Sequence, residues 1–449
     1  MLRVARRIPF AGAQVALRQR MTPFAIVLFT ALSTVLAFAQ TASEARNPVP
    51  PNYDEAKVGQ YSLPDALTLI SGEHVADAET WYKFRRPEIL HLFSTYVYGR
   101  TPEQKLKMSC QPFDVTEHAL GGTAVRKQVT CSFGEKDQVR KMDILIYLPA
   151  SAQKPVPLFL GLNFSGNQTI NADPAIKLGD VWDRNTKVRQ PAAEKTRGSW
   201  DREWQVEKVI GHGYGIASIY YGDIDPDFPG GIKEGIRPLF FAPGETDPAA
   251  DDWGSIGAWA WGLSRALDYL ETDKAIDAKR VSLVGQSRLG KTVLWAGAQD
   301  TRFAMVVANC SGRSGASLAR RNFGETVEHM VEAFPHQFAL NYQRYGKDTD
   351  KLPVDTHELL ALIAPRPVLL GTGSEDHWSD PKGEFLAAEA AEPVFRLLGA
   401  DGLGTSEMPP LDQPILHRIG FLYRDGKHQI TPYAWDVFLK FADMYFRSQ

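Results

Sequence analysis

Apolar and polar positions follow two patterns along the chain, short apolar runs and longer segments of helical periodicity. Strands are expected at 106–115, 124–133, 141–148, 157–162, 215–221, 281–284, 303–308, 367–371 and 419–423. Helices are expected over 78–98, 253–271, 383–397 and 432–446, and in 253–271 apolar residues recur every three or four positions. This alternation predicts an α/β fold, a mostly parallel central sheet with helices on both faces in three layers.

The first 39 residues have the pattern of a secretion signal. Five arginines precede an apolar run from Phe24 to Ala39, which ends in the small-x-small sequence Ala37-Phe38-Ala39. Cleavage is expected before Gln40, which would place the protein in the periplasm or outside the cell, without stable membrane insertion. A membrane anchor is the alternative, although the run is short for a spanning helix. Residues 40–449 contain no evident linker, and we interpret them as one catalytic domain.

Removal of this segment would make the chain more acidic. It contains five arginines and no acids, so Lys+Arg falls from 50 to 45 while Asp+Glu stays at 53. The net charge then changes from −3 to −8. A mildly acidic surface argues against nucleic acid as a partner.

Three cysteines are present, Cys110, Cys131 and Cys310. An exported chain can form disulfides, and Cys110 and Cys131 lie in adjacent strand-like segments. We hypothesise that these two pair and that Cys310 is free; the alternative is three reduced thiols. The sequence has neither a CxxC nor an HExxH motif, so no metal site is expected.

The segment most informative about function is Val281-Ser-Leu-Val-Gly-Gln-Ser287-Arg-Leu-Gly-Lys291. An apolar strand-like run leads into the turn at Ser287, and a helix-like segment follows over 291–298. Strand, sharp turn and helix with a serine at the turn are typical of the nucleophile elbow of α/β-hydrolases. Glycines two before and two after Ser287 leave room for a tight crossing, and the helix N-terminus favours developing negative charge. A structural turn is the alternative, because Gly-x-Ser-x-Gly alone is a weak signal.

A nucleophilic serine needs a base and an acid that orients the base, and in this fold their order is serine, acid, histidine. His428 lies in a glycine-containing loop between the last expected strand and the last helix, so it is the candidate base. Glu375 and Asp376 follow the strand 367–371 and are the candidate acids, and the usual spacing favours Asp376. The alternatives are a solvent-facing histidine and an acid that caps the following helix.

With these residues in place, the chain resembles the bacterial glucuronoyl esterases of carbohydrate esterase family 15. The resemblance covers most of 75–446 and includes Arg85-Arg-Pro-Glu-Ile-Leu90, Trp261-Gly-Leu-Ser-Arg-Ala-Leu-Asp-Tyr-Leu270, Ser287-Arg-Leu-Gly-Lys-Thr292 and Trp378-Ser-Asp-Pro-Lys-Gly-Glu-Phe385. It implies an α/β-hydrolase fold and a secreted serine esterase that needs no cofactor. The implied substrate is the ester that joins (4-O-methyl-)glucuronic acid side chains of glucuronoxylan to lignin or other alcohols.

The resemblance also implies roles for residues near Ser287. Arg288 would stabilise negative charge on the carbonyl oxygen, beside backbone N–H groups. Lys291, one helical turn from Ser287, would bind the sugar together with Glu325 and Trp378. The corresponding structural alternatives are a surface arginine, a solvated lysine, a glutamate at a helix start and a packing tryptophan.

One position departs from the family pattern. Where many members carry a catalytic glutamate this chain has Cys310, and a neutral thiol cannot replace a carboxylate as partner of an imidazolium. The acid must then be Asp376, as in some bacterial members, or the triad is incomplete. Arg313 stands where many bacterial relatives have a cysteine, which puts in doubt the disulfide that such members form there.

Two other functions stay open at this point. A broader carboxylesterase, such as an acetyl-xylan esterase, would use the same serine chemistry, but the charged Arg288 and Lys291 favour a uronate over an acetyl group. A non-catalytic carbohydrate-binding relative is suggested by Cys310. The presence of Ser287, Asp376 and His428 argues against this non-catalytic role.

Overall fold

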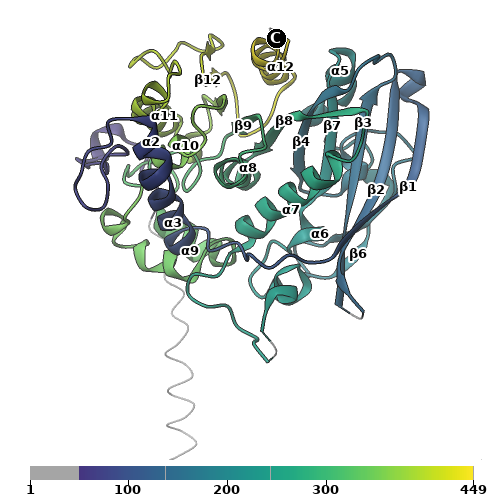
Figure 1. Cartoon of the computed structure of the whole chain (residues 1–449), viewed down its shortest axis with the longest axis horizontal. Helices are drawn as coiled ribbons and strands as arrows, with labels where there is room; N and C mark the ends of the chain where they lie inside the picture. Colours follow the sequence, from purple (N-terminus) through teal and green to yellow (C-terminus); the bar gives the residue numbers. More distant parts are fainter. Residues whose placement is uncertain (1–49, 137, 243, 448–449) are drawn as a thin grey trace, which may run out of the picture. The chain divides into compact units, whose positions relative to one another are not determined.

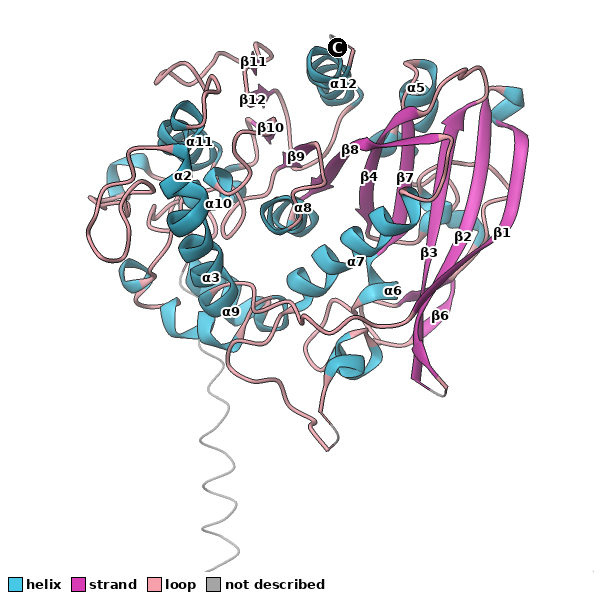
Figure 2. Cartoon of the chain, viewed as in Figure 1, coloured by secondary structure: helices cyan, strands magenta, loops and turns pink. Residues whose placement is uncertain are grey.

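A mixed sheet of ten strands runs through the part of the chain that the computed structural model describes, residues 50–447 except 137 and 243 (Figures 1 and 2). Six neighbouring strands are parallel, in the spatial order β7 (Gly215–Tyr220), β4 (Val156–Asn163), β8 (Ile276–Gln286), β9 (Met305–Asn309), β10 (Val368–Gly373) and β12 (Ile419–Arg424). Antiparallel strands complete the two edges, β1 (Met108–Ala119), β2 (Ala124–Glu135) and β3 (Gln138–Pro149) on one side and β11 (Ile415–Leu416) on the other. The mostly parallel sheet predicted from the sequence is confirmed.

Helices bury both faces of this sheet. Side chains alternate between the faces of a strand, so in β10 Val368 and Leu370 pack in one apolar core and Leu369 packs in the other. The first core includes the helices α7 (Ser255–Leu270), α8 (Arg288–Gln299), α10 (Thr356–Ala361) and α11 (Pro381–Leu397). The second includes α5 (Val206–Gly211) and α12 (Pro432–Phe446). The three predicted layers are therefore present, and their parallel strands are apolar on both faces.

The helix expected over 78–98 has an irregular hydrogen-bond pattern near its start. The chain forms α2 (Ala78–Thr80), a π-type turn over Trp81–Arg85 and then α3 (Arg86–Tyr96). Pro87 has no N–H to donate to the preceding turn, and just before it the N–H of Arg86 donates to the carbonyl of Trp81, five residues back. The chain therefore stays helical through this segment, although its backbone hydrogen bonds locally span five residues instead of four.

The polar segment 171–205 forms an insertion with little regular structure. It contains a hairpin of β5 (Asp180–Trp182) and β6 (Arg189–Pro191) and the short helix α4 (Asp201–Trp204), none of which the sequence pattern predicted. Two further short helices, α6 (Tyr221–Ile224) and α9 (Val327–Ala333), lie in the segments that follow β7 and β9.

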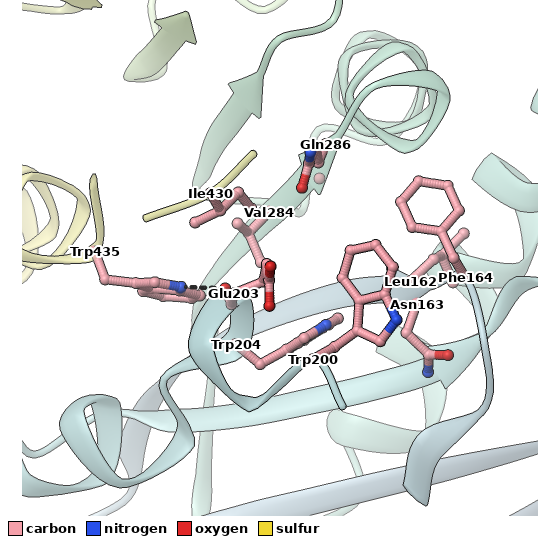
Figure 3. Close-up of a pocket in the computed structure, with 11 residues that line it drawn as sticks. Leu162, Asn163, Phe164, Trp200, Glu203, Trp204, Val284, Gln286, Ile430 and Trp435 are labelled. Carbon is pink, nitrogen blue, oxygen red and sulfur yellow. Dashed lines mark hydrogen bonds between the residues drawn. The ribbon is translucent and has the colours of Figure 1, made fainter. Parts of the chain in front are cut away.

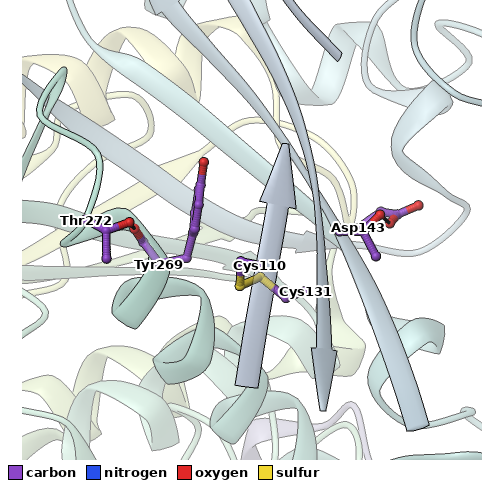
Figure 4. The surroundings of a disulfide bond; sticks show 6 residues. Cys110, Cys131, Asp143, Tyr269 and Thr272 are labelled. Atoms are coloured by element: carbon purple, nitrogen blue, oxygen red, sulfur yellow. Dashed lines mark hydrogen bonds between the residues drawn. A yellow bond between two sulfur atoms is a disulfide. The ribbon is translucent and has the colours of Figure 1, made fainter. Parts of the chain in front are cut away.

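Cys110 and Cys131 occupy opposite positions in the β1–β2 pair and form a disulfide bond (Figure 4). The predicted pairing is thus confirmed. Cys310 is buried and free.

From Pro50 onward the chain forms one compact unit. The expected secretion signal at 1–39 and the expected domain start at residue 40 lie outside the described residues and stay predictions. Within the described residues, no helix combines the length and the apolar character that crossing a membrane requires.

Candidate active site

Ser287 lies at the sharp turn between β8 and α8, where a parallel strand ends. Its φ of 58° and ψ of −130° form a backbone conformation that residues with side chains rarely adopt. Gly285 permits the crossing, because a Cβ atom there would lie 2.2 Å from the carbonyl oxygen of Leu289. The Ser287 N–H donates to the Asn309 carbonyl at 2.9 Å, which fixes the turn to the end of β9. The geometry is that of a nucleophile elbow.

The side chains of Asp376 and His428 meet, although they follow different strands. Asp376 follows β10 and His428 follows β12, and these strands are neighbours in the sheet. Asp376 Oδ2 lies 2.7 Å from His428 Nδ1. Burial would raise the pKa of Asp376, but the hydrogen bond and the charge of His428 outweigh it and lower that pKa. Glu375 is exposed, so the acid in contact with the imidazole is Asp376.

Three side chains donate hydrogen bonds to the backbone carbonyls of His428 and its two neighbours. Gln286, directly before Ser287, donates from Nε2 to the carbonyl oxygen of His428 at 3.1 Å. Asn309 donates to the carbonyl of the next residue at 3.1 Å. Arg424, buried at the end of β12, donates from Nη2 to the carbonyls on both sides of His428, the preceding one at 2.5 Å. The histidine loop is therefore fixed to the ends of β8, β9 and β12.

Cys310 lies directly after β9, beside this acid and base. Its thiol is buried, its sulfur accepts a hydrogen bond from Asn309 Nδ2 at 3.2 Å, and it lies within 4.8 Å of a carboxylate oxygen of Asp376. Burial, together with the negative charges of Asp376 and Glu384, raises the pKa of the thiol well above its usual value. Cys310 is therefore a neutral group beside the Asp376 carboxylate and cannot take its place.

Arg288, the first residue of α8, is held by a carboxylate that the sequence analysis did not identify. Its Nη1 pairs with Asp227 Oδ2, and its guanidinium lies 4.8 Å from the centre of the Phe334 ring. Asp227 also accepts hydrogen bonds from His336 at 2.8 Å and from Gln337 at 2.7 Å. Burial opposes ionisation, yet the His336 bond and the Arg288 charge hold the pKa of Asp227 well below its usual range.

Lys291, Glu325 and Trp378, the residues predicted to bind sugar, lie together. Lys291 and Glu325 form a buried ion pair with 3.1 Å between Nζ and Oε1, and Lys291 also donates to the Ser311 carbonyl at 2.6 Å. The N–H of Glu325 donates to the carbonyl of Trp378 at 2.9 Å. Trp378 itself is 36% exposed, so the group combines two buried charges with an aromatic surface open to solvent.

Known proteins are similar to this chain in sequence and fold. A family model described as glucuronyl esterase of fungi matches residues 248–399, which include Ser287 and Asp376. A carbohydrate esterase from an unknown prokaryotic organism is 49% identical over 396 residues, 87% of this chain and 91% of that protein. The structure of a glucuronoyl esterase from Solibacter usitatus matches with a TM-score of 0.85 at 49% identity, over 87% of this chain and 100% of that one. A promiscuous esterase of family 15 from a marine bacterial metagenome matches with a TM-score of 0.83 at 48% identity, over 88% and 100%.

The chain belongs to the glucuronoyl esterases of carbohydrate esterase family 15. The family and the enzyme class that the sequence motifs implied are confirmed. So is the α/β-hydrolase fold, because these two family 15 structures match over 87% and 88% of this chain.

A pocket with aromatic walls lies beside the elbow of this esterase (Figure 3). It is lined by Leu162, Asn163, Phe164, Trp200, Glu203, Trp204, Val284, Gly285, Gln286, Ile430 and Trp435. Gln286 directly precedes Ser287, and Ile430 follows His428 by two residues. Trp200 and Trp204 come from the insertion, which therefore supplies a wall next to the site. The sequence pattern had indicated only a polar surface segment there.

One group of side chains in the described part of the esterase has the spacing of metal ligands. The ligand atoms of Cys310, Asp376 and His428 all lie within 4.8 Å of one another. Asp376 and His428 already bond to each other, and the Arg424 guanidinium lies 3.8 Å from Cys310 Sγ. A positive charge at that distance opposes a bound cation. The arrangement fits proton transfer better than a metal centre.

Proposed function

We propose that this esterase is exported and hydrolyses the ester between (4-O-methyl-)glucuronic acid side chains of glucuronoxylan and lignin or other alcohols. Ser287 is the nucleophile, His428 the base and Asp376 the acid that orients it. The observation that carries the proposal is the 2.7 Å contact between Asp376 and His428, in a loop that Gln286 fastens to the elbow.

The first half of the reaction forms an acyl-enzyme. Asp376 binds Nδ1 of His428, which leaves Nε2 to take the proton of the Ser287 hydroxyl as its oxygen attacks the ester carbonyl. Arg288 and backbone N–H groups stabilise the negative charge that develops on the carbonyl oxygen. The intermediate then collapses, and His428 gives its proton to the departing alcohol.

The second half releases the uronic acid. His428 takes a proton from water, the resulting hydroxide equivalent attacks the acyl carbonyl, and the bond to Ser287 breaks as the proton returns to its oxygen. Ser287 and His428 finish in their starting protonation states. These side chains account for the whole cycle without a further reactant besides water.

The charged side chains around Ser287 support a uronate as the acyl group. Lys291 and Glu325 are buried and paired, and each keeps the capacity to hydrogen-bond sugar hydroxyls. Trp378 offers an exposed ring face. An acetyl group is too small to use any of these contacts, so their presence favours a sugar-bearing acyl group.

Export is supported by two observations. The sequence pattern at 1–39 is that of a secretion signal. The Cys110–Cys131 disulfide is a bond that persists in oxidising compartments outside the cytosol. Mass spectrometry of the protein recovered from its native host would test export, because a mature N-terminus at Gln40 is expected and an intact N-terminus would contradict it.

The reaction is tested on two substrates, the benzyl ester of glucuronic acid and acetylated xylan. Each is incubated with the purified wild-type enzyme and with its Ser287→Ala variant. Wild type is expected to hydrolyse the glucuronate ester far faster than it releases acetate, and Ser287→Ala is expected to lose both activities. Faster acetate release would favour an acetyl-xylan esterase instead. That second function has one observation in its favour, since a relative at 48% identity is described as promiscuous.

The same variant distinguishes a purely carbohydrate-binding role from catalysis. If wild type turns over neither ester, and Ser287→Ala binds acidic xylo-oligosaccharides as tightly as wild type, binding without catalysis is the better account. Isothermal titration calorimetry supplies the affinities. The neutral Cys310 is the feature that motivates this comparison.

A further inference from the structure

The first described segment, residues 50–57, is fastened to the loops that carry the sugar-binding residues. Asn52 donates from Nδ2 to the carbonyl of Asn322 at 2.6 Å, and its own carbonyl accepts from the N–H of Gly324 at 2.8 Å. Glu55 forms ion pairs with Arg321 and, at 3.2 Å, with Lys382. These bonds place Tyr53 between two anchored residues, next to the loop that ends in Glu325.

Tyr53 places its ring beside residues that adjoin the loops carrying Glu325 and Trp378. The ring centre lies 6.0 Å from that of Phe323 and 6.3 Å from that of His377, the residue directly before Trp378. The side chain is nevertheless 51% exposed. Partial burial and the negative charges of Asp376 and Glu325 raise the pKa of Tyr53.

We propose that Tyr53 and Trp378 form an aromatic surface that binds neutral xylose units of the xylan chain next to the esterified uronic acid. The inference rests on the proposed function, and extends it from the uronic acid to the chain that carries it. Both rings are exposed, and both adjoin the segment 324–325: the carbonyl of Asn52, directly before Tyr53, accepts from the N–H of Gly324, and the carbonyl of Trp378 accepts from the N–H of Glu325.

The surroundings favour a neutral ligand. The nearby acids are already paired, Glu55 with Arg321 and Lys382 and Glu325 with Lys291. The C–H faces of a pyranose ring pack on an aromatic face without any charge, and a ring that is already anchored loses little conformational freedom on binding. A xylan main chain has this character, since its xylose units carry no charge.

The experiment compares two methyl esters that share one leaving group. One is the methyl ester of free 4-O-methylglucuronic acid, and the other is the same ester carried on a xylo-oligosaccharide. Tyr53→Ala is expected to raise KM for the oligosaccharide about two- to tenfold more than KM for the free sugar ester. Tyr53→Phe keeps the ring and is expected to retain most of the wild-type preference.

Tyr82→Ala is the matched control, because Tyr82 is 49% exposed and lies in the π-type turn away from the site residues. It is expected to leave both KM values at the wild-type level.

An equal change on the two esters, or an equal loss in Tyr53→Phe and Tyr53→Ala, would overturn the inference while leaving the proposed function intact. A wild type inactive on both esters would instead overturn the proposed function, and the inference with it. Thermal unfolding of each variant separates a binding effect from misfolding.

Discussion

His428 Nδ1 is held 2.7 Å from Asp376 Oδ2, by loops that follow the neighbouring strands β12 and β10. An asparagine at 376 would present an amide of the same shape but would no longer fix the imidazole tautomer that leaves Nε2 free to accept a proton. Asp376→Asn is therefore expected to lower kcat by about 10⁴-fold on benzyl glucuronate, the size known for such a change in serine hydrolases.

Glu375→Gln is the matched control for this prediction, because it removes the adjacent, exposed carboxylate. It is expected to keep wild-type kcat and KM. If Glu375→Gln were as inactive as Asp376→Asn, the assignment of the acid would be wrong. Thermal unfolding curves of both variants show whether a loss of activity reflects a loss of folding.

The sheet could be predicted from sequence because its strands are buried on both faces. The apolar run at 367–371 became β10 (Val368–Gly373), and the run at 419–423 became β12 (Ile419–Arg424). Strands of this kind appear in the sequence as continuous apolar segments, and residues typical of turns mark both of their ends. Ser287, Asp376 and His428 could be proposed because each follows such a strand, and strand order brings their loops to one edge of the sheet.

The residues that position the site were not predictable in the same way. Asp227 lies in an irregular loop, and nothing in its neighbourhood along the chain indicates that it meets Arg288, 61 residues later. Arg424 directly follows the strand predicted at 419–423, and only the structure shows that it ends β12 and is buried. Such contacts depend on how loops fold back over the sheet, which periodicity does not encode.

Asp227 is expected to act through Arg288. In Asp227→Asn the side chain keeps its shape but loses the charge that holds the guanidinium, so kcat is expected to fall by about tenfold with little change in KM. Arg288→Ala removes the charge proposed to stabilise the oxyanion and is expected to cost about 10²- to 10³-fold in kcat. The double variant should be no slower than Arg288→Ala alone, because the two residues act in series.

Steady-state kinetics on benzyl glucuronate measure all three variants, and Asp277→Asn is the control. Asp277 forms a surface ion pair with Arg280 within β8 and is expected to be neutral to activity. If Asp227→Asn slowed the enzyme equally in the presence and absence of Arg288, its effect would have to pass through another residue, such as His336.

Cys310 is expected to support the acid only weakly. Cys310→Ala removes a buried neutral polar group within 4.8 Å of the Asp376 carboxylate, and kcat is expected to decrease by no more than about tenfold. Cys310→Ser keeps a neutral polar group at this position and should lie closer to wild type. Cys310→Glu would place a second carboxylate beside Asp376 and Glu384 and is expected to bring no gain; a clear gain in kcat would mean that the esterase lacks a competent acid.

Glu384, in α11, is expected to make the stability of the esterase depend on pH. It is fully buried, and its Oε1 accepts hydrogen bonds from the N–H of Gly312 at 2.7 Å and from the hydroxyl of Ser311 at 3.1 Å. Burial, with a further contribution from the charge of Asp376, raises its pKa from 4.5 to about 8. The folded state therefore binds this proton more tightly than the unfolded state does. The stabilisation is complete below about pH 4.5 and is lost progressively as the pH rises to about 8.

Glu384→Gln tests this dependence, because a glutamine keeps the acceptor oxygen and has no proton to lose. The free energy of unfolding of wild type should fall between about pH 5 and pH 8 relative to that of the variant, by a few kcal/mol in total. Denaturant unfolding at constant ionic strength measures both curves, with the exposed Glu332→Gln as control. Parallel curves for wild type and Glu384→Gln would mean that Glu384 ionises in the folded esterase as readily as in the unfolded chain. In that case, hydrogen bonds to the Glu384 carboxylate, including others besides those from Gly312 and Ser311, would cancel the effect of burial on its pKa.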